Sequence, residues 1–309
     1  MNIVRYRIAG TPDVRIGVSN GDRVRELAGI DSLAELWALR LGDIRTRVAD
    51  ASGDDVALAD VDLLAPVDGR TEVWAAGVTY ETSREARVEE SERAATVYEQ
   101  VYDAVRPEVF FKSVAWRVVG PGGQLGVRAD STVDVPEPEL AVVVNRAGEI
   151  CGYTVCNDVS SRSIEGENPL YLPQAKIYWG ACGIGPWIRP AWEVDDPYAL
   201  GIRLTISRGG SVVWDGTANT GQLHRKLDEL VEYLMRGDLH PDGVVLSTGT
   251  CLVPAAPFTL ADGDTVAIAL DEIGTLANTV RRGRPQGPIE RGLIEQGQTE
   301  QGQTEEEQS

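Results

Sequence analysis

Short apolar segments of strand length, separated by glycine- and proline-rich connections, fill most of the sequence after residue 70. These segments cover residues 71–78, 109–112, 139–145, 149–157, 202–207, 211–214, 244–247 and 265–269. Between residue 105 and the C-terminal tail, only residues 222–236 have helical periodicity, with one apolar face that ends before Gly237. Strands rarely alternate with helices, so a doubly wound parallel sheet is disfavoured and a β-rich α+β fold is expected.

Residues 1–65 are predicted to form a small N-terminal α+β domain. Apolar and polar residues alternate over 4–8, and a second apolar run follows at 14–18, which is typical of a strand pair. Ser32, with a glutamate three residues later, has the spacing of a helix-starting capping box. The acidic segment 54–67 is interpreted as a linker to the next domain.

The remaining chain divides into a larger domain over residues 66–283 and a tail over 284–309. The longest helical pattern, from Thr82 to about Val105, is apolar on one side only in its second half. Its charged first half is expected to be either solvated or mobile. The tail repeats GQTE and has little to bury, so it is predicted to be disordered and acidic.

The composition excludes several functional classes. The formal net charge of −19 repels phosphate backbones, so we expect neither nucleic acid nor an anionic membrane as a partner. No apolar window has the length of a membrane span, and no secretory signal is visible, so a cytoplasmic location is expected. Two histidines cannot build a histidine-rich zinc site, and the four cysteines contain no CxxC pair. Carboxylates, lysine and arginine are therefore expected to perform any chemistry.

The stretch from residue 133 to 163 predicts an antiparallel hairpin with acidic residues at its open end. If Asn145 pairs with Glu149 across the turn, the residue numbers of each pair add up to 294. Asp158 then lies opposite Pro136 and beside Glu137. Glu137 and Glu139 are two residues apart, so they project from the same face of their strand. Three carboxylates therefore converge at this end.

Such a cluster is costly unless a positive charge neutralises it, because nearby carboxylates resist joint ionisation. Oxygen ligands without histidine or cysteine suit a hard divalent cation such as Mg²⁺, Mn²⁺ or Ca²⁺. The alternative is a solvated hairpin end whose acids face water. Two prolines bracket Glu137, and both strands are apolar, but the pattern alone leaves both interpretations open.

Seven segments in a fixed order resemble the fumarylacetoacetate hydrolase superfamily, from about Glu72 to Val280. They are AAGVTY at 75–80, RPEVFFKS at 106–113, PEPELAVVV at 136–144, GYTVCNDVSSRS at 152–163, QAKIYWGACGIGPWI at 174–188, LSTGT at 246–250 and ADGDTVAIALDEIGTLANTV at 261–280. The resemblance implies a mixed-β roll with a central active site. It also implies a homodimer or a higher homo-oligomer.

The resemblance further implies roles for individual residues. It gives Glu137, Glu139 and Asp158 as the ligands of Mg²⁺ (or Mn²⁺ or Ca²⁺). It gives Lys176 as a group that reaches the substrate, Thr250 as a group that binds its carboxylate, and Arg162 as an active-site arginine that binds the substrate.

One departure from the superfamily's hydrolases and decarboxylases concerns a histidine. Those enzymes commonly place it shortly after the tyrosine of the segment that matches GVTY, where it helps to activate water. Here no histidine follows Tyr80, and Ser83 stands near that position. The run GVTYxxSxxARxEES resembles instead the branch that dehydrates 2-keto-3-deoxy sugar acids. Ser83 and Arg87 are therefore expected to contact substrate from a mobile lid, unless they lie on a solvated helix face.

The implied function is that of a hydro-lyase in pentose catabolism. It would convert a 2-keto-3-deoxy-pentonate, derived from arabinonate or xylonate, to 2-oxoglutarate semialdehyde through a metal-stabilised enolate. Glu108 and Lys176 are the candidates for proton transfer, and desolvation beside a cation is expected to depress the pKa of Lys176. The alternatives are an acylpyruvate hydrolase or oxaloacetate decarboxylase on the same fold, and a catalytically silent keto-acid-binding protein.

Overall fold

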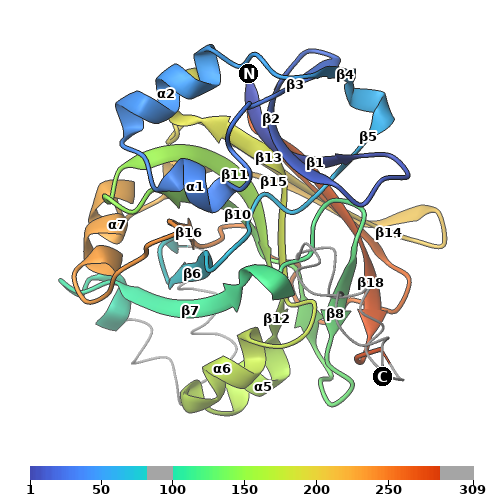
Figure 1. The fold of residues 1–309 in the computed structure, drawn as a ribbon. Coiled ribbons are helices and arrows are strands. Elements are labelled where there is room, and N and C mark those ends of the chain that lie inside the picture. Colours follow the sequence, from blue (N-terminus) through green and yellow to red (C-terminus); the bar gives the residue numbers. More distant parts are fainter. Residues whose placement is uncertain (82–99, 286–309) are drawn as a thin grey trace, which may run out of the picture.

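The computed structural model describes residues 1–81 and 100–285, and within them the chain is a mixed, strand-rich α+β structure (Figure 1). The larger sheet has eleven strands. From edge to edge its path is β4 (Asp55–Ala57), β3 (Arg23–Glu26), β2 (Val14–Asn20), β1 (Asn2–Ile8), β13 (Cys182–Pro190), β11 (Ile150–Asp158), β10 (Pro138–Val144), β16 (Val244–Ser247), β6 (Glu72–Gly77) and β7 (Glu108–Val114), with β5 (Val61–Leu63) paired to β1.

A second sheet of five strands packs against the first. Its order is β15 (Ser211–Asn219), β14 (Gly201–Arg208), β17 (Thr265–Leu270), β18 (Gly274–Arg282) and β8 (Gln124–Val127). A short ladder joins β9 (Asp134–Val135) to β12 (Ser160–Ser161). The β16–β6 and β18–β8 pairs are parallel, whereas the other pairs in these sheets are antiparallel, so the predicted mixed-β architecture is confirmed.

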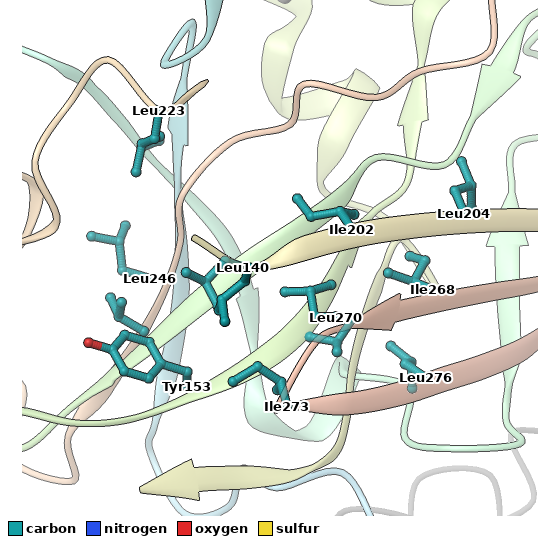
Figure 2. Packing of buried hydrophobic residues seen from close by; sticks show 14 of the residues in the cluster. Leu140, Tyr153, Ile202, Leu204, Leu223, Leu246, Ile268, Leu270, Ile273 and Leu276 are labelled. Carbon is teal, nitrogen blue, oxygen red and sulfur yellow. The ribbon is translucent and has the colours of Figure 1, made fainter. Parts of the chain in front are cut away.

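Alternation along the central strand β10 places its apolar side chains in two separate cores. Leu140 and Val142 belong to the core between the two sheets, to which helix α7 (Leu227–Met235) also contributes. In Figure 2, Leu140 lies close to Leu270 of β17 and Leu246 of β16. Ala141 and Val143 face the other side, where α1 (Leu33–Trp37) and α2 (Leu41–Ala49) cover the sheet. Both faces of β10 are therefore buried, and an acid on this strand sits in a dry environment.

The predicted N-terminal strand pair and capped helix are confirmed, but the predicted linker is wrong. β1 and β2 are antiparallel neighbours, and the Ser32 hydroxyl accepts the Glu35 amide at 3.2 Å. The segment predicted as a linker instead forms β4 and β5, because its few apolar residues pack with β1 in a third, smaller core. β1 also pairs with β13, so these strands continue the large sheet. A domain boundary near residue 65 stays a prediction.

The predicted helices differ from the observed ones in their limits. α7 begins at Leu227, five residues later than expected, and a 3-10 turn occupies Thr220–Gln222. Most of the predicted helix over 82–105 and almost all of the predicted tail lie outside the described residues. At the described end of that helix, Val101 and Tyr102 pack on Val78, whereas Val105, predicted on the apolar stripe, is 85% exposed.

The helices α5 (Arg162–Glu167) and α6 (Leu172–Lys176) follow β12 and lie beside the open end of the β10–β11 hairpin (Figure 1). Asn168 and two prolines, at 169 and 173, break this stretch into short helical turns. Each turn presents one basic residue, Arg162 or Lys176, toward the hairpin end. No helix among the described residues combines the length and apolarity needed to span a membrane.

Candidate active site

Glu137 and Asp158 are adjacent across the hairpin of β10 and β11. The amide of Asp158 donates to the Glu137 carbonyl at 3.0 Å, so Asp158 lies opposite Glu137. The predicted partner, Pro136, is therefore wrong by one position. A β-bulge at Cys151 causes this shift. Val143 pairs with Gly152 and Val144 pairs with Ile150, so Cys151 has no partner in the ladder. The shift brings the carboxylates closer together than the predicted register would.

The three acids form one buried cluster. Glu137, Glu139 and Asp158 are each at most 2% exposed, and each offers a carboxylate oxygen within 4.8 Å of the others. The predicted convergence of these side chains is confirmed, and the alternative of acids that face water does not hold. An oxygen-only donor set of this size fits a hard divalent cation.

Glu139 is the member of the cluster without an ion pair to a cation of the described residues. Its Oε2 accepts the Ser247 hydroxyl at 2.6 Å and the Gly249 amide at 2.8 Å, and no lysine or arginine of the described chain forms an ion pair with it. Burial raises the pKa of Glu139 well above its ordinary value of 4.5, and the neighbouring Asp158 raises it further. A divalent cation would supply the missing positive charge, so the residues fit a metal.

The turn that contacts Glu139 requires a glycine at position 249. Its φ is +93°, a conformation that residues with a Cβ rarely adopt, and a Cβ there would lie 2.0 Å from the Thr79 Oγ1. The turn after β16 thus aims a backbone N–H at the Glu139 carboxylate.

Lys176 and Arg162 neutralise the outer part of the cluster. Lys176 Nζ donates to Glu137 Oε2 at 2.7 Å and to Asp158 Oδ2 at 2.9 Å. Arg162 Nη2 lies 2.8 Å from Glu137 Oε1, and its Nη1 lies 3.5 Å from Glu165 Oε2. All of these groups are buried. The structure therefore brings both predicted basic residues to the predicted carboxylates.

A small pocket lies beside the cluster. Its cavity volume is about 20 Å³, and it is partly open to solvent. Its wall is formed by Ala76, Gly77, Val78, Glu108, Phe110, Glu137, Glu139, Asp158, Glu165, Leu172, Lys176, Gly249 and Thr250. The site thus combines charged groups with the apolar side chains Phe110 and Leu172 in a concave surface, as expected of a small-molecule site.

Glu108 reaches this pocket because Gly77 pairs with it across β6 and β7. A Cβ on Gly77 would lie 2.0 Å from Glu108 Oε2, so only glycine leaves room for the carboxylate in this position. Glu108 is half-buried, which distinguishes it from the fully buried trio. The predicted candidate for proton transfer thus lies on the pocket wall.

Thr250 also lies on the wall, with its hydroxyl already engaged. Thr250 Oγ1 donates to the Pro138 carbonyl at 3.0 Å and accepts the Leu252 amide at 3.2 Å. The hydroxyl therefore ties the turn after β16 to the first residue of β10. Its predicted contact with a substrate carboxylate stays a prediction.

Ser83 and Arg87 lie outside the described residues, so their predicted contacts with substrate are not placed. The two histidines lie away from the pocket wall. The His224 ring stacks on Tyr102 with centroids 4.3 Å apart, and His240 Nδ1 is 3.7 Å from Glu72. Neither belongs to the pocket-lining residues.

The sequence interpretation missed Lys112 and Glu165. Lys112, on β7, forms an ion pair with Asp158, and Glu165, on α5, lines the pocket. A signal for Lys112 was present, since the chain has only three lysines, at 112, 176 and 226, and this one follows two phenylalanines. An isolated lysine in an apolar strand of a lysine-poor chain suggests an inward-facing charge.

Residues 72–281 match the family profile described as fumarylacetoacetate (FAA) hydrolase C-terminal. The chain is 51% identical over 255 residues to a probable 2-keto-3-deoxyxylonate dehydratase of Haloferax volcanii, which covers 82% of this chain and 86% of that protein. It is 44% identical over 267 residues to 2-dehydro-3-deoxy-D-arabinonate dehydratase of Saccharolobus solfataricus, with 85% and 83% covered.

The fold is also similar to a solved 2-keto-3-deoxy-D-arabinonate dehydratase in complex with magnesium and 2,5-dioxopentanoate. The TM-score is 0.79 at 37% sequence identity, and the match covers 92% of this chain and 100% of the other.

Proposed function

The chain belongs to the fumarylacetoacetate hydrolase family, and from this premise we propose that it dehydrates a 2-keto-3-deoxy-pentonate to 2-oxoglutarate semialdehyde. The substrate is the keto acid derived from arabinonate or xylonate, and the enzyme is a hydro-lyase that works with a divalent cation. The 2,5-dioxopentanoate bound in the solved relative is this same semialdehyde.

The buried trio of carboxylates beside Lys176 is the observation that carries the proposal. Glu137, Glu139 and Asp158 are the residues that would hold Mg²⁺ (or Mn²⁺ or Ca²⁺). When bound there, the cation supplies Lewis-acid polarisation of the carboxylate and keto oxygens of a 2-keto acid.

The charge balance of the site suits an anionic substrate. Four buried carboxylates, at positions 137, 139, 158 and 165, face three buried cations, at positions 112, 162 and 176. One negative charge is therefore in excess, and a divalent cation would turn it into one positive charge. A 2-keto acid with a single carboxylate then brings this buried set to zero net charge, which is favourable in a low-dielectric environment. Glu108, half-buried on the pocket wall, is not part of this set.

The reaction requires proton transfers and no co-reactant. A hydrogen leaves C3 and the hydroxyl leaves C4, together as water. One hydrogen then moves from C5 to C3 to give an enol, and the hydrogen of the C5 hydroxyl moves to C4 to give the aldehyde. Lys176 and Glu108 both line the pocket, and we assign these transfers to them. Thr250, at the turn after β16, is assigned to the substrate carboxylate. Arg162 orients Glu137 and Glu165 through its ion pairs.

The hydrolytic alternative has less support from this site. Acylpyruvate hydrolysis needs an activated water, and the histidine that commonly provides it in the family has no counterpart among the described pocket residues. Dehydration needs no attacking water, so the carboxylates and Lys176 suffice.

The test is to incubate the purified protein with Mg²⁺ and each of the two keto-deoxy-pentonates. A semialdehyde dehydrogenase reports the product, and mass spectrometry checks for the loss of one water. We expect turnover of at least one keto acid, with stoichiometric semialdehyde. Release of pyruvate from an acylpyruvate, without turnover of either keto-deoxy acid, would support the hydrolase instead. Binding of pyruvate or oxalate without any turnover would support a silent binding protein.

The homodimer or higher homo-oligomer and the cytoplasmic location are also part of this proposal. Sedimentation of the purified protein and fractionation of cells would test them.

A further inference from the structure

Lys112 is a fully buried charge next to the active site, and its ammonium group makes three contacts. Its Nζ donates to the carbonyl of Val159 at 3.2 Å and to the carbonyl of Lys176 at 2.6 Å, and it forms an ion pair with Asp158 Oδ1. The side chain has no exposed surface. A lysine at this depth is retained only where its charge and its donors are compensated.

These contacts compensate the charge and the donors of the side chain. Two N–H groups of the ammonium donate to backbone carbonyls, and its positive charge faces the Asp158 carboxylate. Lys112 is also fully buried and is not part of the pocket wall, whereas Lys176 is. Lys112 is therefore not placed to touch a substrate in the pocket, so any effect of Lys112 on the reaction must pass through the groups that it contacts.

One of those groups is the carboxylate of Asp158. Its Oδ2 accepts Lys176 Nζ at 2.9 Å, while its Oδ1 faces Lys112. The two ammonium groups therefore contact both oxygens of the Asp158 carboxylate, and together they fix its orientation. Val159, the next residue, is held by the same ammonium through its carbonyl.

The other group is the backbone of Lys176. This residue ends the five-residue helix α6, where carbonyl groups have no donor inside the helix. Lys112 supplies that donor. The strand β7 thus anchors the short helix from which Lys176 extends to Glu137 and Asp158.

We propose that Lys112 is a positioning residue that sets both the Asp158 carboxylate and the Lys176 backbone for the metal site. The inference rests on the proposed metal site. A merely stabilising ion pair would affect the melting temperature of the protein and leave the metal affinity of the folded protein unchanged.

The experiment compares Lys112→Met with Lys226→Met in the full chain. Methionine keeps the length of the side chain and removes its charge. Lys226 is an exposed residue before α7, with its Nζ 4.7 Å from the Tyr198 ring centroid, and it is outside the pocket. Calorimetric titration with Mg²⁺ or Mn²⁺, without substrate, gives the Kd, and circular dichroism confirms the fold.

We expect the metal Kd of Lys112→Met to rise at least tenfold and its kcat at saturating metal to fall at least 100-fold, with KM within threefold. Lys226→Met should keep all three values within twofold. A folded Lys112→Met protein with wild-type metal Kd would overturn the inference. A wild-type protein that binds neither cation would instead refute the metal site itself.

A second measurement uses the wild-type protein, in case the variant does not fold. Because the chain has only three lysines, reductive methylation with ¹³C-formaldehyde gives a spectrum with few signals. Lys226 should be methylated at least 100-fold faster than Lys112 in the native protein. Equal rates would contradict the buried, ion-paired ammonium on which the inference depends.

Discussion

The Ser247 hydroxyl donates to Glu139 Oε2 at 2.6 Å, at the junction of β10 and β16 in the centre of the large sheet. Together with the Gly249 amide, it stabilises the carboxylate without supplying a positive charge. The metal-free protein therefore has a buried acid whose ionisation is costly, and a bound cation removes that cost. Several consequences can be measured.

Glu139→Gln should stabilise the metal-free protein while it weakens metal binding. The amide retains an oxygen for Ser247 and Gly249 but has no charge to desolvate. At pH 7.5 we expect a rise in melting temperature of about 1–2 °C, the shift that about 1 kcal/mol gives in a chain of this size. The metal Kd should rise at least tenfold. Glu232→Gln, on an exposed part of α7, is the control.

The same variant gives a pH dependence with a definite sign. The pKa of Glu139 is raised in the folded protein, so keeping this residue ionised opposes folding. This destabilisation is absent below pH 4.5, the ordinary pKa of glutamate, and it grows as the pH rises above 4.5. The stability difference between Glu139→Gln and the wild type should therefore shrink toward pH 4.5. A difference that grows on acidification would contradict the buried, metal-free carboxylate.

Arg162→Met should destabilise the protein strongly. It removes the guanidinium between Glu137 and Glu165, both of which are buried. Removing one partner of a buried ion pair costs about 3 kcal/mol or more, which chemical denaturation would detect. Arg236→Met breaks an exposed pair with Glu232 and should cause little change. Equal effects of the two substitutions would rule out a buried network around Arg162.

Glu108→Gln should separate proton transfer from binding. The amide keeps the size of the side chain against Gly77 but cannot exchange a proton. We expect kcat to fall about 100-fold or more, with KM within threefold and the metal Kd unchanged. Steady-state kinetics and calorimetry on one preparation measure all three. An unchanged kcat would remove Glu108 from the chemistry.

The thiols should take no part in activity. Burial raises the pKa of Cys151 to about 12 and that of Cys251 to about 11, so little reactive thiolate is present at pH 8. Iodoacetamide at that pH should leave both residues unmodified in the native protein, as read by mass spectrometry, and activity should be retained. Rapid alkylation with loss of turnover would point to a role that this site does not give them.

Part of the site was predictable because the relevant chemistry is local in the sequence. Glu137 and Glu139 share a strand face through the two-residue repeat, and the proximity of Asp158 follows from hairpin pairing. The one-residue register error arose at a bulge, which adds a residue without a distinctive sequence signal. Such a kink depends on packing between strands rather than on propensity.

Other elements could not be read from local patterns. β13 is a central strand, yet it contains Gly183, Gly185 and Pro186, residue types that argue against a central strand. Gly183 is crowded by Leu125 and Asn278, so tertiary contact rather than propensity decides its place. Lys112 was missed for a similar reason, because its three acceptors come from segments far away in the sequence.

The most direct test of the whole account is the stoichiometry of metal binding. Calorimetric titration of the full chain with Mg²⁺ or Mn²⁺ should give one site per chain for the wild type. Glu137→Gln and Asp158→Asn, with the fold checked by circular dichroism, should each lower the affinity at least tenfold and abolish dehydration. Wild-type affinity in both folded variants, or dehydration that persists in excess chelator, would contradict a divalent cation held by these carboxylates.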